Sequence, residues 1–539
     1  MQFSRPLKSS AHCLPSPDGA YIATIIQAKL IIRTTRFLQA TRAIPLPAAF
    51  STSISNFLWS PSSQRILLSS DNTIRVFSAV TPQYSATIAS PTSETTKAVY
   101  ISFGASHDEV LVFSDFGLKL SIFHLTTSTS IDIPGPKLFH PGNAAKGYGY
   151  RPKTQHLALL SRGGGKDVIS LHSKETYKVF RSWNPDTIDA QALSWSPDGK
   201  WLAVIESAAQ GHRILFYTAD GHLFKAWTGP RPAADEKDID CGAGVKTVEW
   251  SVDGRQLATR SVDGRQLAVG DYSERVTLLS TANFSEAMRL DQSTTIRPDG
   301  VHIWQEQLKA TPSGLSRSYN LQTQVTCPPT SASSTPSPDA KSGIVSLAID
   351  ASGTLIASRC ENLPTTVFIW DSSSKILKAV LIQHSPIAKV TWHPTISEVL
   401  VIRCEGDESK GVAYVWEPSW EEPKIVNFST QLPEGKIMGK AVIRWLKTSD
   451  SRYPALFFSD THDCILASIS EAGSTDVDLP WKDAEEKAVD IYGQLEESPL
   501  VLVPAGAGKT TARQIMDNEP TITTFGALGD MDDTFHFKR

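Results

Sequence analysis

Ala192–Ala203 reads Ala-Leu-Ser-Trp-Ser-Pro-Asp-Gly-Lys-Trp-Leu-Ala, and this stretch decides the fold. Leu193 and Trp195 alternate with serines, which is the period of a half-buried β-strand. The tripeptide that follows, Pro197-Asp198-Gly199, is typical of a tight turn, since proline presets φ and glycine accepts φ > 0. Apolar residues then resume at Trp201. The stretch therefore predicts a β-hairpin.

Copies of this hairpin recur along the chain at a nearly fixed interval. The position held by Pro197 is held elsewhere by Pro17, Pro61, Ala105, Pro152, Val252, Ala351 and Pro394, with a degraded ninth copy at Ile443-Arg444-Trp445. An apolar residue follows each complete anchor five positions later: Ile22, Ile66, Val110, Leu157, Leu202, Leu257, Ile356 and Val399. The first five anchors are separated by 44, 44, 47 and 45 residues. Such a period indicates a propeller array.

A third strand is predicted to complete each copy. It is visible at Thr73–Phe77, Lys119–Phe123, Arg213–Tyr217, Thr366–Asp371 and Val412–Trp416. The pair Trp370-Asp371 is the dipeptide after which WD repeats are named. A weaker fourth strand, such as Ile376–Ile382, is expected at the outer edge, which completes one propeller blade. Since a lone blade cannot bury both of its faces, neighbouring blades must stack.

The predicted fold class is therefore all-β, a WD40-type β-propeller. Two arrangements stay open: one large ring of about eight or nine blades, or two propellers with a seam near 327–342. The expected domains are 1–326 (blades one to six plus an insert), 327–342 (a disordered, low-complexity loop), 343–503 (the remaining blades) and 504–539 (a flexible tail). Phe3–Leu7 is expected to complete the last blade and so remove its open edge.

Several stretches interrupt the period. Ser251–Ala258 recurs letter for letter as Ser261–Ala268, and the ten extra residues must loop out or lengthen the hairpin. Between residues 268 and 346 the chain holds one blade plus roughly 45 residues, including a predicted strand at Val301–Trp304. Other expectations are a surface loop at Gly229–Gly244, an acidic segment at Glu471–Ser498 with a short helix near Asp483–Asp490, and a strand at Leu500–Val503.

Composition excludes some classes of function. The net charge is −4 and no basic stripe is present, so nucleic acid is not an expected partner. No run of about 18 apolar residues is present, so no membrane span is expected. The N-terminus lacks the apolar core of a signal peptide. The six cysteines are scattered without a Cys-x-x-Cys pair, which favours reduced thiols in a cytosolic protein.

Motifs that could carry chemistry are weak. Ala505–Thr511 resembles a phosphate-binding P-loop, but Val503 stands where the motif requires glycine, so a flexible turn is favoured over a nucleotide-dependent enzyme that uses Lys509. Arg162–Lys166 is predicted to be a hairpin connection between two strands. Trp59, Trp195, Trp250 and Trp392 share one repeat position, which favours blade packing. We therefore predict no enzyme and assign no catalytic, cofactor-binding, metal or partner-binding residues.

The order of features over residues 1–470 resembles a known family. The segments that carry the resemblance are Cys13–Ala23, Lys29–Arg33, Leu193–Gly199, Ile214–Leu223, Gly244–Ser251, Leu347–Arg359, Asn362–Asp371 and Ser385–Pro394. They are similar to the fungal members of the WD-repeat family of centrosomes and spindle pole bodies that is encoded antisense to a p53-relative gene. The loop after Gly229, the duplication at 251–268 and the tail after 471 depart from the family pattern.

The resemblance implies a non-enzymatic scaffold at the spindle pole body or centrosome, in the cytoplasm and its cytoskeleton. It implies a complex that anchors microtubule minus ends and supports spindle assembly. The implied partners are a coiled-coil microtubule-anchoring protein, a minus-end-directed kinesin and the γ-tubulin complex. The alternative hypothesis is a ribosome-associated propeller of the translation-initiation type.

Overall fold

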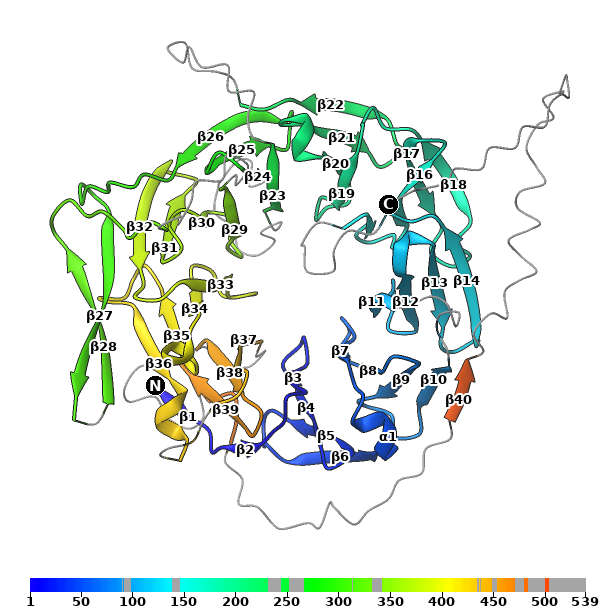
Figure 1. Ribbon diagram of the computed structural model, residues 1–539, viewed down its shortest axis with the longest axis horizontal. Coiled ribbons are helices and arrows are strands. Elements are labelled where there is room, and N and C mark those ends of the chain that lie inside the picture. Colours follow the sequence, from blue (N-terminus) through cyan, green and yellow to red (C-terminus); the bar gives the residue numbers. More distant parts are fainter. Residues whose placement is uncertain are drawn as a thin grey trace, which may run out of the picture.

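Nine β-sheets follow one another around a ring with a central opening (Figure 1). The structure is a computed structural model that describes residues 1–89, 91, 98–137, 146–230, 244–251, 266–312, 314–331, 342–433, 436, 438–447, 453–470, 479–482 and 500–503. Each sheet is one blade, and its strands are called a to d from the inside of the ring outward. The prediction of a single propeller is confirmed with nine blades, and the alternative of two propellers is wrong.

The first five blades keep the predicted plan of strands. Blade 1 contains β3 (Cys13–Pro15), β4 (Tyr21–Ile26), β5 (Lys29–Thr34) and β6 (Ala40–Pro45). Blade 2 contains β7 (Asn56–Trp59), β8 (Arg65–Ser69), β9 (Thr73–Ser78) and β10 (Ser85–Ala89). Blade 3 contains β11 (Ala98–Phe103), β12 (Glu109–Ser114), β13 (Lys119–His124) and β14 (Thr129–Pro134). Blade 4 contains β15 (Tyr148–Tyr150), β16 (Leu157–Gly163), β17 (Lys166–His172) and β18 (Val179–Trp183). Blade 5 contains β19 (Ala190–Trp195), β20 (Trp201–Glu206), β21 (Ile214–Thr218) and β22 (Leu223–Trp227).

Most departures from this plan lie in the last four blades. Blade 6 contains β23 (Val245–Trp250), β24 (Gln266–Asp271), β25 (Arg275–Ser280) and β26 (Ser285–Asp291). Blade 7 contains β29 (Ile344–Ile349), β30 (Leu355–Cys360), β31 (Thr366–Asp371) and β32 (Ile376–Ile382), with β27 (His302–Thr311) and β28 (Gly314–Gln322) added outside. Blade 8 contains β33 (Ile387–Trp392), β34 (Leu400–Cys404), β35 (Val412–Trp416) and β36 (Lys424–Asn427). Blade 9 contains β37 (Val442–Leu446), β38 (Ala455–Ser459) and β39 (Asp463–Ser468).

Helical structure among the described residues is confined to single turns. These are α1 (Ala48–Ser51) and four short 3-10 turns at Asp115–Gly117, Ala208–Gln210, Asp407–Ser409 and Phe428–Gln431. None of the described helices is long and apolar enough to cross a membrane.

The core consists of nine hydrophobic clusters, one between each pair of neighbouring blades. Strand b shows how one sequence serves two interfaces. In β8, Ile66 and Leu68 pack toward blade 1, whereas Leu67 packs toward blade 3. Successive side chains of a strand point to opposite faces, so each fully apolar strand fills both of its neighbouring interfaces. A blade therefore has no core of its own.

Tryptophans at the end of strand a fix the alignment of neighbouring blades. The indole N–H groups of Trp59, Trp195, Trp392 and Trp445 donate to backbone oxygens of the preceding blade at 3.0–3.2 Å, namely those of Leu14, Gly149, Ala348 and Thr391. Trp250 makes the same crossing to the Ser194 hydroxyl, at 2.9 Å. The prediction that Trp59, Trp195, Trp250 and Trp392 pack the blades is confirmed, and Trp445 adds a fifth hydrogen bond between neighbouring blades. We call this set the indole ladder.

The N-terminus closes the ring. The short strands β1 (Gln2–Phe3) and β2 (Leu7–Lys8) pair antiparallel with β39 on the outside of blade 9. The side chain of Leu7 is buried in the cluster between blades 9 and 1, together with Cys13 and Phe457. The prediction that Phe3–Leu7 completes the last blade is confirmed.

Two predictions about strands need correction. We expected Leu257 to follow the anchor of blade 6, but Trp250 pairs with Leu267 of the second duplicated copy. The backbone N–H of Gln266 donates to the Ser251 hydroxyl at 2.8 Å, which is the contact that residues five apart make in an unduplicated hairpin. The second copy forms β24 because it lies directly before β25, with which β24 must pair.

The second correction concerns blade 7. We expected β32 to lie at the outer edge, but β27 pairs with it in parallel and β28 then pairs with β27. The extra residues before residue 346 therefore form a hairpin on the outside of this blade. Leu500–Val503 is a strand as predicted, β40, and it pairs in parallel with β10 on the outside of blade 2.

Some predicted segments fall outside the described residues. These are the charged part of the Gly229–Gly244 loop, most of the 327–342 loop, the helix near Asp483–Asp490, the P-loop-like stretch with Lys509 and the rest of the 504–539 tail.

The turn after β33 predicts a pH dependence of stability. The Nδ1 atom of His393 accepts backbone N–H bonds from Ile396 at 2.8 Å and Thr395 at 3.2 Å, and the side chain is only 2% exposed. Burial lowers the pKa of His393 to about 4. Between about pH 6.5 and pH 4 the unfolded chain therefore binds more protons, so acid destabilises the folded state by about 3 kcal/mol through this residue.

His393→Ser should remove this acid sensitivity, because serine holds the same position in blades 1, 2, 5 and 6. Urea unfolding at pH 7 and pH 4 should show a smaller loss of unfolding free energy in His393→Ser than in the unmodified protein. The exposed His462 supplies the control, and His462→Ser should keep the full loss. An equal loss in all three proteins would contradict the assignment.

Candidate interaction surface

The alternation of strand direction sorts the connections onto two faces of the ring. Neighbouring strands of a blade run antiparallel, so the turn between strands b and c lies at the same end as the link from strand d to the next strand a. We call this end the linker face. The turns between a and b and between c and d lie on the opposite, hairpin face. Both faces can carry binding residues, because connections carry function more often than the strands beneath them.

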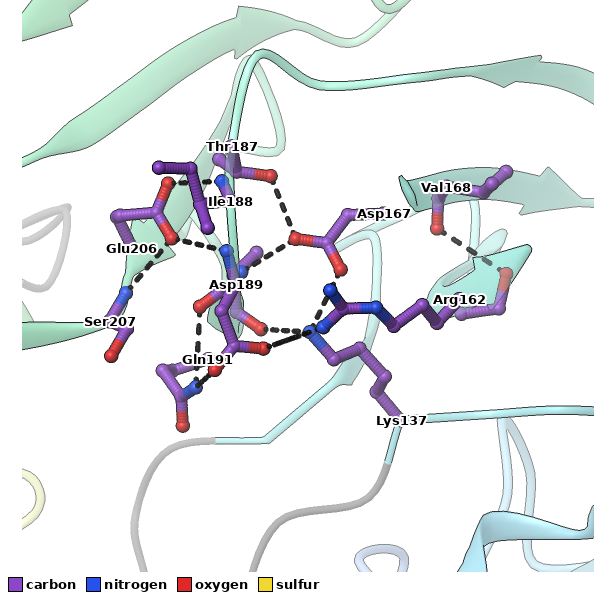
Figure 2. Close-up of polar contacts among 12 residues, drawn as sticks. Lys137, Arg162, Asp167, Val168, Thr187, Ile188, Asp189, Gln191, Glu206 and Ser207 are labelled. Carbon is purple, nitrogen blue, oxygen red and sulfur yellow. Dashed lines mark hydrogen bonds and ion pairs between the residues drawn. The ribbon is translucent and has the colours of Figure 1, made fainter. Parts of the chain in front are cut away.

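A network of charged residues ties blades 3, 4 and 5 together on the linker face (Figure 2). Lys137 follows β14, and its Nζ lies 2.8 Å from Asp167 Oδ1 and 2.7 Å from Asp189 Oδ1. Asp167 begins strand c of blade 4, and Asp189 lies in the link from blade 4 to blade 5. Arg162, 46% exposed, reaches Asp189 from the neighbouring turn at 3.3 Å. We call Lys137, Asp167, Asp189 and Glu206 the linker clamp.

Asp167 is the centre of the clamp because its side chain is completely buried. Its Oδ2 accepts from the backbone N–H of Ala190 at 2.7 Å and from the Thr187 hydroxyl at 2.9 Å. Burial would raise the pKa of Asp167, but the hydrogen bonds from Lys137, Ala190 and Thr187 outweigh burial and hold that pKa below its ordinary value. The carboxylate is thus ionised and fully bonded, which suits a structural anchor.

Glu206 holds the same link from the side of blade 5. Its carboxylate accepts the backbone N–H groups of Ile188 at 2.9 Å and Asp189 at 2.8 Å (Figure 2). Two buried carboxylates from neighbouring blades therefore fix the link between them. The side chain of Ile188 is 58% exposed on this rigid segment. An exposed apolar side chain on a fixed backbone can bind a partner without a large loss of conformational entropy.

Phe116 is a second exposed apolar residue on the linker face. It lies in the turn between strands b and c of blade 3 with φ +55°, a conformation that costs a residue with a Cβ about 1–3 kcal/mol. Its side chain is 93% exposed, so burial does not offset this cost. The next residue must be glycine, because a Cβ on Gly117 would lie 2.7 Å from the Pro136 oxygen. Of the described non-glycine residues with φ > 0, Phe116 is the one whose large apolar side chain is exposed, which makes this turn a candidate binding feature.

These residues lie in neighbouring connections of the linker face. Gly117 lies against Pro136, and Pro136 pairs with Ser161, which directly precedes Arg162. We define the blade 3–5 patch as Phe116, Leu118, Arg162, Ile188 and Asp189. It combines three exposed apolar side chains with one ion pair, and the linker clamp holds the backbone at Ile188 and Asp189. Such a surface can recognise a protein partner, and it presents no nucleophile paired with a base.

The structure also places the residues that the sequence singled out. Gly164 and Gly165 form the two-residue turn of the β16–β17 hairpin with φ +56° and +78°, which confirms the hairpin predicted at Arg162–Lys166. Across the described part of the chain, no three His, Cys, Asp or Glu side chains gather closely enough to hold a metal ion. The described cysteines, Cys13, Cys327, Cys360, Cys404 and Cys464, are free thiols.

Sequence reasoning missed both the linker clamp and the patch. Lys137, Asp167 and Glu206 come from three different repeats, and no local spacing connects them. The one available signal was the pair Phe116-Gly117 between two strong strand patterns, since a glycine after an aromatic residue in a short connection indicates a tight turn with an exposed ring.

The nine-bladed ring and its indole ladder define a WD40-type β-propeller. No protein-family model matches the chain. The chain is 25% identical over 519 residues to an uncharacterized WD repeat-containing protein of Schizosaccharomyces pombe, and the match covers 92% of this chain and 97% of the relative. It is 24% identical over 440 residues to WD repeat-containing protein WRAP73 of Mus musculus, with 78% and 87% covered. The chain is thus similar over most of its length to WD repeat-containing proteins.

Solved structures resemble the chain more loosely. The crystal structure of the eukaryotic initiation factor aligns with a TM-score of 0.47 and 8% identity, covering 78% of this chain and 89% of that chain. The C-terminal WD40 domain of Sif2 aligns with a TM-score of 0.40 and 11% identity, covering 80% and 98%. Alignments this loose carry no argument about function.

The linker clamp predicts that Asp167→Asn destabilises the protein strongly. Removing one partner of a buried, hydrogen-bonded ion pair costs about 3–5 kcal/mol. Asp132 is the matched control, because it pairs with Lys119 at 3.0 Å on the exposed outer side of blade 3. Asp132→Asn should cost less than about 1 kcal/mol. Denaturant unfolding measures both, and similar small losses in the two variants would contradict the clamp.

Proposed function

We propose that this protein is a non-enzymatic scaffold that binds partner proteins through the linker face of its propeller. The observation that carries this proposal is the blade 3–5 patch, where Phe116 stays exposed in a turn with φ > 0 and the clamp fixes the backbone at the exposed Ile188. The similarity to WD repeat-containing proteins supports a protein-interaction role.

The place of action that we propose is the spindle pole body or centrosome, within the cytoplasmic cytoskeleton. The support is the resemblance of residues 1–470 to the WD-repeat family of these organelles. The scaffold would belong to a complex that anchors microtubule minus ends and supports spindle assembly. Its proposed partners are a coiled-coil microtubule-anchoring protein, a minus-end-directed kinesin and the γ-tubulin complex.

The chemistry of the patch suits the first of these partners. An amphipathic helix presents apolar residues three and four positions apart, flanked by charges. Phe116, Leu118 and Ile188 offer apolar contacts to such a stripe, and the neighbouring Arg162–Asp189 pair offers both signs of charge at its border. Exposed aromatic residues are also frequent energetic anchors of protein interfaces.

Fluorescent tagging of the chain at its own locus tests the proposal. We expect foci at the spindle poles throughout mitosis, and affinity purification followed by mass spectrometry should recover the microtubule-anchoring partner. A diffuse signal through mitosis would contradict the proposed location. Co-migration with small ribosomal subunits in a sucrose gradient would instead favour the translation-initiation alternative.

A patch variant tests the binding surface separately. Phe116→Ser combined with Ile188→Ser should reduce recovery of the partner at least about tenfold, because loss of interface anchors costs about 2 kcal/mol or more. Phe180→Ser is the matched control, since Phe180 is 53% exposed on the outer strand of blade 4 and away from the patch. Equal recovery by the patch variant and the control would contradict the assigned surface.

A further inference from the structure

Strand β28 gives blade 7 an outer edge unlike that of the other blades. It pairs with β27 over nine consecutive residue pairs without a register shift, and it pairs with no other strand in the described part of the chain. The β27–β28 hairpin stands outside the circle formed by the other blades (Figure 1). Its last strand therefore presents a long, regular row of backbone groups to the surroundings.

Buried polar contacts hold this hairpin against blades 7 and 8. Arg317 of β28 donates to Glu306 Oε1 at 2.7 Å and to the hydroxyl of Tyr414 at 2.8 Å. The Tyr414 hydroxyl in turn donates to Glu306 Oε1 at 2.7 Å. Tyr319 is buried and donates to Gln383 Oε1 at 2.8 Å. The edge strand is therefore fixed before any partner binds, which lowers the entropic cost of pairing.

The edge lacks the usual protection against pairing. Natural edge strands are blunted by proline, bulges or outward charges. β28 contains no proline and no bulge, and its one charged residue, Arg317, is turned toward Glu306 and Tyr414. Only two residues separate Thr311 from its partner Gly314 at the end of the hairpin. In such a two-residue hairpin, the last pair of residues is a hydrogen-bonded pair, so the backbone N–H and C=O groups of Gly314 point toward β27. In the alternation that follows, Leu315, Arg317, Tyr319 and Leu321 direct their backbone groups outward.

Other edges of this ring already accept an added strand. β40 pairs in parallel with the outermost strand of blade 2, and β27 does so with β32. The outer edge of a blade is thus a surface on which the chain itself builds further strands.

We propose that β28 pairs antiparallel with β28 of a second copy of this chain, with a two-fold axis at Ser318. The sequence of the strand, Gly-Leu-Ser-Arg-Ser-Tyr-Asn-Leu-Gln, is self-complementary about this point. Leu315 and Leu321 lie three residues before and after Ser318, are 48% and 47% exposed, and would meet each other across the axis. Ser316 would oppose Asn320, and no two like charges would face each other.

The self-complementarity favours a second copy over an unrelated strand. In a two-fold interface, each residue must oppose a suitable residue of an identical strand. Leu315 of each copy would oppose Leu321 of the other, so the apolar pair forms on both sides of the axis. Pairing would join two blades into one continuous sheet and cover both leucines. One strand pair is a small interface, so the dimer should be weak and depend on concentration.

Disulfide trapping tests the register directly. Cross-strand residues that are not hydrogen-bonded to each other lie about 4.5 Å apart at Cα, within the range of a disulfide, and Ser318 would oppose itself in such a pair. In a Cys327→Ser background, Ser318→Cys should form at least about tenfold more covalent dimer under mild oxidation than Ser316→Cys. Ser316 lies on the same strand but would oppose Asn320, so it controls for random collision.

Sedimentation of the full chain supplies the second readout. The unmodified protein should show a mass that rises toward that of a dimer with concentration. Leu315→Glu combined with Leu321→Glu should stay monomeric, because it places like charges opposite each other at both ends of the pair. Equal trapping of the two cysteine variants would overturn the proposal. An unmodified protein that stays monomeric at every concentration would also overturn it.

Discussion

The constraint on which this structure depends is that no blade can bury its own apolar faces. Every hydrophobic cluster is shared between two neighbouring blades, and at five of the nine interfaces an indole N–H of the ladder also bonds one blade to the next. Trp392 of blade 8 and Trp445 of blade 9 show this in consecutive blades, since each indole N–H donates to a backbone oxygen in strand a of the preceding blade. The ring must then close on itself, and the strands at Gln2–Phe3 and Leu7–Lys8 provide the closure.

The same dependence on neighbours shapes the functional surfaces. The linker clamp joins three blades through two buried carboxylates, and these carboxylates hydrogen-bond the backbone of the link at Ile188 and Ala190. The blade 3–5 patch is therefore a fixed surface, which is what a scaffold needs in order to hold partners in a constant geometry. Blade 7 differs because its added hairpin extends the sheet outward, and so it offers an edge as well as a face.

Much of this fold could be predicted from the sequence because its determinants are local. The alternation in Leu193–Trp195 and the turn at Pro197–Gly199 recur along the chain, and the copies formed strand pairs at the expected places except in blade 6. The closure by Phe3–Leu7 followed from the need to remove an open edge. Features that depend on contacts between repeats could not be predicted. The β27–β28 hairpin has no counterpart in other repeats, and the clamp joins residues that only the ring brings together.

Two further differences have physical explanations of the same kind. The duplicated copies are identical in sequence, so no local signal could show that Leu267, and not Leu257, would pair with Trp250. The turn that carries Phe116 also has a tertiary requirement, because Gly117 lies so close to Pro136 that a side chain would not fit there.

The unfolding free energy of two tryptophan variants tests the central claim most directly. Trp392→Phe removes an indole N–H that crosses to the preceding blade at 3.0 Å. Trp370→Phe removes a buried indole N–H that meets no acceptor in the described part of the chain, so it controls for the loss of ring volume. Our account predicts that Trp392→Phe costs about 1–2 kcal/mol more than Trp370→Phe, because the Ala348 oxygen loses its donor. An equal cost for the two variants would contradict the indole ladder as the device that aligns the blades.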